Sequence, residues 1–208
     1  MLGSLLSRLR RSPDVRDSAS FSNLLHRHAA FISQKGTQEF VRAKAGLNWS
    51  KLIKEQDYID ALEKSRWEAL AAVLEDLVVI SEGFLRPESQ GRLEPIRLWL
   101  LGCYRDILHE HPIPPHRPQG WQAEINHADL RLQSAQSATP LPPHEIAEVS
   151  GAKVYEFLPI HSNLRMFDLE LVTNNVRFNI IRFRDELSER VNRADVVADV
   201  LGAEQAGR

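Results

Sequence analysis

The sequence predicts an all-α protein: an irregular helical bundle with a proline-rich strap between the third helix and the C-terminal helices. Apolar residues recur every three or four positions along several long stretches, as on one face of a helix. Such a stripe has to pack against another element, which favours helix-on-helix architecture. Prolines gather between residues 112 and 143, where they interrupt the helical pattern. The clearest stripe lies near the C-terminus and comprises Val172, Val176, Ile180, Phe183, Leu187 and Val191.

Length and composition favour one soluble globular domain. The chain has 208 residues, of which 43% are hydrophobic and 26% are charged, as in ordinary globular proteins. We expect a single helical domain over residues 18–201. Before it we expect a flexible or amphipathic segment, 1–17, and after it a disordered tail, 202–208.

Charge and cysteine content exclude some classes of partner. The net charge is −2, from 26 basic and 28 acidic residues, which gives no general attraction to nucleic acid. The single cysteine, Cys103, has no internal disulfide partner, as expected in a reducing compartment. We therefore expect a cytoplasmic protein without a nucleic-acid partner. The alternative location is the inner face of a membrane, as a peripheral protein.

Residues 1–12 allow two interpretations. Leu2, Leu5, Leu6 and Leu9 would share one side of a short helix, which could attach to a membrane surface. The alternative is a frayed terminus, because so short a helix is marginal in water. Ser18 or Ser20 is then expected to cap a long helix that ends near Gly46, with Gly36 at a close helix crossing or a break.

A second long helix is predicted from about Asp57 to Leu85, at the centre of the bundle and packed against the C-terminal helix. Arg66 interrupts its apolar stripe and is expected either to extend its charged end to the solvent or to pair with an acid such as Glu63. A third helix is predicted over residues 90–109. The expected core includes Trp67, Leu70, Leu77, Phe84, Trp99, Ile180 and Phe183.

The strap covers residues 112–143, and its middle part, 120–136, has helical character. Residues 145–159 allow either a short helix or a short strand. A long C-terminal helix is predicted to begin at Ser162. It would end near Asn192 or continue to Leu201, where Gly202 would close it.

Histidines are the main candidates for chemistry. His109, His111 and His116 follow the third helix, near Cys103, Asp106 and Glu110. Metal sites need several such donors to converge, but residues two apart on a helix point in nearly opposite directions. The same spacing argues against a site at His26 and His28. We therefore expect a polar helix end, with no metal and no cofactor.

The sequence shows no nucleophile or phosphate-binding motif. No Gly-x-Ser-x-Gly elbow occurs, and the glycines are scattered singly rather than grouped in a phosphate-binding loop. Cys103 lies in an apolar stripe, which is typical of a core cysteine.

Polar residues Asn175, Asn179, Arg182 and Glu186 form a strip beside the last apolar stripe. Asparagine is unfavourable inside helices, so this strip is a candidate partner-binding surface. The alternative is a solvated face held by pairs such as Arg182–Glu186 and Glu186–Arg190.

Two short segments, Ser65–Ala69 and Gly83–Pro87, resemble small uncharacterised helical proteins of alphaproteobacteria, some of which carry an esterase label. The resemblance covers residues 31–87. It implies a bacterial cytoplasmic protein and transfers no catalytic residue, because the chain contains no hydrolase motif.

The leading hypothesis is therefore a non-catalytic interaction or scaffold protein that binds a protein partner or a second copy of itself. One alternative is a hydrolase with a site near the histidines of residues 109–116, since loops often carry function. The other is a peripheral membrane adaptor that uses residues 1–12.

Overall fold

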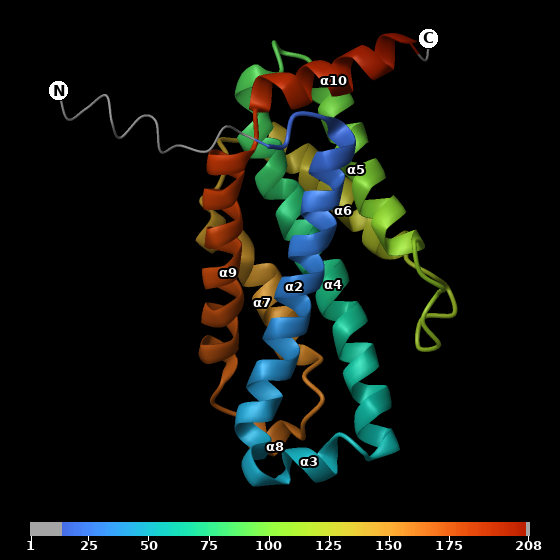
Figure 1. The fold of residues 1–208 in the computed structure, drawn as a ribbon, viewed down its shortest axis with the longest axis vertical. Helices are drawn as coiled ribbons and strands as arrows, with labels where there is room; N and C mark the ends of the chain where they lie inside the picture. The colour runs from blue at the N-terminus through green and yellow to red at the C-terminus, as the bar shows by residue number, and fades with distance from the viewer. Residues whose placement is uncertain (1–13, 207–208) are drawn as a thin grey trace, which may run out of the picture.

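The computed structural model describes residues 14–206, and in this part of the chain every regular element is helical (Figure 1). One isolated parallel bridge, between Val15 and Val191, is the only β pairing there. No helix of the described part combines the length and apolar character needed to cross a membrane. The helices are α2 Ser18–Ala45, α3 Trp49–Leu52, α4 Gln56–Leu85, α5 Leu93–His109, α6 Gln122–Gln136, α7 Pro143–Glu156, α8 Ser162–Arg165, α9 Leu169–Arg190 and α10 Arg193–Ala206.

Helix α4 is central, as predicted, and packs against α2, α5, α6 and α7. Helix α9 packs mainly on α7 and makes only a small contact with α4, so the predicted packing of α9 on α4 holds only in part. The α7–α9 crossing is close because Gly151 has no side chain: a Cβ there would lie 2.7 Å from Thr173 Cγ2. Figure 1 shows α10 across one end of the bundle, and α3 and α8 at the other.

The predicted apolar stripes largely form the core. All six residues of the C-terminal stripe are buried, as are Leu70, Leu77 and Phe84 of α4. Trp67 and Trp99 are only partly buried, because each lies at the edge of the core. Gly36 marks a helix crossing rather than a break, since a Cβ there would meet Val154 and Val176 at 3.5 and 3.6 Å.

The start of the domain differs from the prediction. Asp17, rather than Ser18 or Ser20, caps α2, because its carboxylate accepts the Ser20 N–H at 2.8 Å. Val15 is buried and exchanges backbone hydrogen bonds with the end of α9. Residues 14–17 are therefore part of the fold rather than a flexible segment. The predicted amphipathic helix over residues 1–12 lies outside the described residues.

The C-terminal part also differs in its boundaries. The predicted helix from Ser162 is divided: α8 ends at Arg165 and α9 begins at Leu169. Gly202 does not close α10, which continues to Ala206, so the predicted disordered tail is wrong for residues 202–206. Glycine inside a helix costs only about 1 kcal/mol relative to alanine, so it weakens a helix without ending it.

The strap contains the predicted helix, α6, between two irregular connections. The ambiguous segment after it is helical: α7 extends through Glu156, which excludes the short strand. The Arg66 Nε atom is buried without a hydrogen-bond partner.

Candidate functional site

The most unusual surface of the described chain lies at the end formed by α3 and α8. Large apolar side chains are exposed there, with exposed fractions between 48% and 99%. We call this surface the apolar end: Leu47, Leu164, Met166, Phe167, Leu169 and Leu171.

Local structure explains why these side chains are exposed. Helix α2 has buried residues as far as Val41, but Gly46 ends it with φ +51°, and Leu47 lies in the short 3-10 helix Gly46–Asn48 that follows and has no buried residue. On the other side, the chain between α7 and α9 contains only the four-residue α8, which has no buried residue. Apolar residues therefore continue past the point where neighbouring helices cover them.

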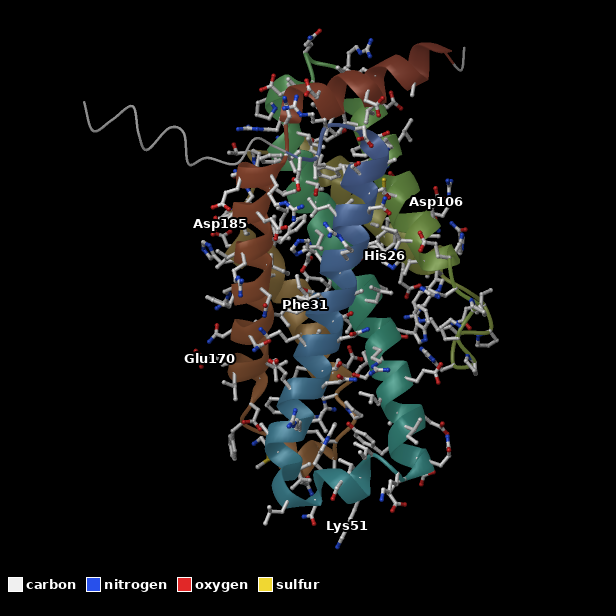
Figure 2. All side chains as sticks on the ribbon, in the orientation of Figure 1. His26, Phe31, Lys51, Asp106, Glu170 and Asp185 are labelled. Carbon is white, nitrogen blue, oxygen red and sulfur yellow. The ribbon has the colours of Figure 1, made fainter. Side chains whose placement is uncertain are left out.

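Polar contacts keep the apolar end in place. Lys44 Nζ pairs with Asp168 Oδ2 at 2.6 Å, which joins the end of α2 to the start of α9. The Tyr155 hydroxyl donates to the Arg165 carbonyl oxygen at 2.8 Å, and the Arg165 guanidinium lies over the Tyr155 ring. Lys51, labelled in Figure 2, marks the same end of the molecule. The rim of the apolar surface thus contains both signs of charge.

The predicted polar strip on α9 is not one continuous exposed surface. Asn175 and Arg182 are exposed, but Asn179 is buried and donates from Nδ2 to the Asn175 carbonyl oxygen at 2.7 Å. Glu186 pairs with His28 and with Arg190, the second pair as predicted. Arg182 lies over the exposed Phe178 ring. The strip therefore combines exposed residues, Asn175 and Arg182, with the buried Asn179 and the ion-paired Glu186.

The candidate histidines do not converge with one another. His116 Nε2 lies 2.9 Å from Glu68 Oε1, and His109 is exposed on the last turn of α5. His111 instead approaches Glu110 and also His26, whose spacing from His28 argues against a site. Figure 2 shows His26 on the flank of α2 nearest α5. Long-range folding brings these donors together, so their spacing along the chain gave no signal.

Several buried ion pairs lie along α4 and at its contact with the strap, and we call them together the buried ion-pair network. Its buried acids lie on α4, and its arginines lie on the strap or directly after α4; Arg117 also pairs with Glu124 of α6. Arg117 binds Glu68 through two hydrogen bonds of 2.6 Å, and Arg131 Nη1 donates to both Glu75 and Asp76 at 2.8 Å. The members of this network are Glu68, Glu75, Asp76, Glu82, Arg86, Arg117 and Arg131.

Burial and pairing move the acids of this network in opposite directions. Complete burial raises the pKa of Asp76 to about 6, against the opposing effects of Arg131 and Ser150. Burial also acts to raise the pKa of Glu68, but hydrogen bonds from Arg117 and His116 outweigh it and the pKa is lowered. Burial raises the pKa of Cys103 to about 11, which fits the predicted core role.

A signal for the network was present in the sequence. Glu68, Glu75 and Glu82 are seven residues apart on a helix whose other buried residues are mainly apolar. Seven residues are two helical turns, so these acids share one face.

Comparison of the chain with family models, curated proteins and solved structures finds no match.

Proposed function

We propose that this protein is a non-catalytic helical interaction protein that binds another protein through the apolar end. The observation that carries the proposal is the group of exposed apolar side chains there, including Phe167, whose exposed fraction is 88%. Soluble monomers rarely expose contiguous apolar patches, and such patches often mark binding sites. Burying one large apolar side chain contributes about 1.5–3 kcal/mol, so a partner would gain from covering several.

Charge at the rim supports a protein partner over an anionic membrane. Lys44 and Arg165 are accompanied by Asp168 and Glu170, whereas a surface that binds anionic lipid is enriched in lysine and arginine. An apolar centre with a polar rim of both charges is the usual anatomy of a protein–protein interface.

The proposal is tested by removing apolar area without disturbing the core. The double variant Leu164→Ser with Phe167→Ser changes two exposed side chains of the apolar end. The matched control is Leu130→Ser with Phe31→Ser, because Leu130 is 64% exposed and Leu164 is 65% exposed. Each protein is used as bait in an extract of the producing cells, and the bound proteins are quantified by mass spectrometry.

We expect a specific partner to be retained by the wild-type protein and the control and lost by the apolar-end variant. If the partner is a second copy, sedimentation velocity will show concentration-dependent association that the same variant abolishes. Identical bound proteins and identical sedimentation for all three would refute the proposal.

A further inference from the structure

A second place in the molecule brings together three side chains that can bind a metal ion. His26 comes from α2, Glu110 directly follows α5, and His111 comes next in the chain. One donor atom from each side chain lies within 4.8 Å of the other two. Among residues 14–206, this is the one group of at least three histidine, cysteine or carboxylate donors that meets this distance.

One of the three donor distances matches that around a bound metal ion. Donors at 2.0–2.2 Å from a tetrahedral ion are about 3.3–3.6 Å apart. His26 Nδ1 and Glu110 Oε2 are 3.2 Å apart. Glu110 and His111 are exposed, so small side-chain rotations can close the remaining separation.

The end of α5 makes this arrangement possible. The helix ends at His109 with Glu110 as its C-cap, and Pro112 prevents its continuation beyond His111. The His111 ring packs edge-on against Trp67 with centroids 5.3 Å apart, and its centroid lies 6.3 Å from that of His26. Trp67 therefore positions one candidate ligand.

A cavity of about 390 Å³ adjoins these donors and includes His26 and His111 in its wall. The rest of the wall comes from α2 and α4 and is mixed: Ile59, Leu62 and Leu70 are apolar, whereas Ser33, Gln34 and Glu63 are polar or charged. Arg66 also lines the cavity, and its Nε atom is buried without a hydrogen-bond partner. This volume is in the range of small-molecule sites, and an unsatisfied donor is an anchor for an anionic group.

We propose that His26, Glu110 and His111 bind a divalent first-row transition-metal ion whose open coordination positions face this cavity. Imidazole and carboxylate donors suit zinc and iron. Structural zinc sites have four protein ligands, whereas sites with three leave a position for water or a ligand. The cavity would then take a small organic anion with an apolar part, held by the ion and by Arg66. This inference does not depend on the apolar end.

The test measures metal binding directly on the full chain. Chelator-treated protein is titrated with Zn²⁺ by isothermal calorimetry at neutral pH. We expect one ion per chain. Loss of an outer-sphere partner alone weakens metal sites by about 10–100-fold, so His111→Ala or Glu110→Gln should weaken binding on the order of 100-fold or more.

His109→Ala is the matched control, because His109 is an exposed histidine of the same segment. It should bind Zn²⁺ like the wild-type protein. Absence of binding at millimolar Zn²⁺, or equal affinity in His111→Ala, Glu110→Gln and the wild-type protein, would overturn the site. Glu110 and His111 are exposed, so circular dichroism should show these variants folded even if His26→Ala is not.

The cavity is tested with Co²⁺ as a spectroscopic probe and phenylacetate as the anion. Phenylacetate should change the visible spectrum of the Co²⁺-loaded protein, and Arg66→Met should weaken this effect at least severalfold while Co²⁺ still binds. An unchanged spectrum at millimolar phenylacetate would overturn the open site facing the cavity.

Discussion

Two histidine–carboxylate clusters in this protein contain the same residue types in opposite surroundings. In the first, His116 contacts Glu68, which is 6% exposed and also receives two hydrogen bonds from Arg117. In the second, His26 contacts Glu110, which is 53% exposed, and His111 lies beside them. The first cluster is in the buried ion-pair network, whereas the second adjoins a cavity.

The difference shows that burial and arginine decide what such a cluster can do. A buried carboxylate is costly unless it is paired and hydrogen-bonded, and arginine remains charged and offers two donors in one plane. The paired carboxylate of Glu68 therefore serves to stabilise the fold. In residues 14–206 no arginine ion pair engages Glu110, so its oxygens remain able to bind a metal ion.

Replacing Arg131 by alanine should cause the largest loss of stability. The substitution leaves Glu75 and Asp76 buried without their shared guanidinium. Breaking a buried ion pair by removing one partner costs about 3–5 kcal/mol. The free energy of unfolding is measured by urea denaturation.

Arg105→Ala provides the control, because Arg105 pairs with Asp106 at an exposed position. Arg105→Ala should lower the free energy of unfolding by less than about 1 kcal/mol, as for other surface ion pairs. Equal losses in the two variants would mean that the buried network does not stabilise the fold in the way its geometry indicates.

Leu77→Ala measures the contribution of apolar packing to stability at a position next to the buried ion-pair network. Leu77 is fully buried and directly follows Asp76 in α4. Its truncation should cost about 2–5 kcal/mol through lost burial and the remaining cavity. Leu164→Ala at the apolar end should change stability by less than about 0.5 kcal/mol, as typical surface substitutions do. Urea denaturation of both variants gives the comparison, and a small loss for Leu77→Ala would contradict the assigned core.

The stripes of the long helices could be predicted from sequence because helical periodicity reports which side chains face the core. The C-terminal stripe is the clearest case, since all six of its residues are buried. Spacing alone is not sufficient, because Leu47 continues the apolar spacing of α2 but is 99% exposed. Periodicity identifies an apolar face without saying whether a neighbouring helix extends far enough to cover it.

The histidine sites could be predicted only in part. The sequence indicates His111 as a candidate ligand, but the spacing of His26 from His28 gives no sign of a shared site. The two residues lie 85 positions apart, and only the packing of α2 beside the end of α5 brings their rings together. Local spacing contains no information on such a contact.

The pH dependence of stability should distinguish Asp76 from the other acids. Its pKa is raised from 3.8 to about 6, so between these values the folded protein binds a proton that the unfolded chain releases. The contribution of Asp76 to the free energy of unfolding therefore falls as pH rises from about 4 to 6. The lowered pKa of Glu68 acts oppositely: its contribution is present above the unfolded pKa and is lost as pH falls through the folded one.

Asp76→Asn removes the titration while keeping the side-chain shape. Since one pKa unit corresponds to about 1.4 kcal/mol, the wild-type decline attributable to Asp76 should be at most about 3 kcal/mol. Unfolding by urea at several pH values gives the difference between the two proteins. That difference should change across pH 4–6 whatever the overall stability of the variant. A constant difference would show that Asp76 titrates normally.

The smallest effect is expected at the second histidine cluster in the absence of metal. Glu110 and His111 are exposed, and α5 has already ended at His109, so His111→Ala should change the free energy of unfolding by less than about 0.5 kcal/mol. With Zn²⁺ present, the wild-type protein should become more stable while His111→Ala does not, because only a folded chain brings the three donors together. Thermal unfolding with and without Zn²⁺ measures both changes. A large loss without metal would instead mean that this cluster serves the fold, as the Glu68 cluster does.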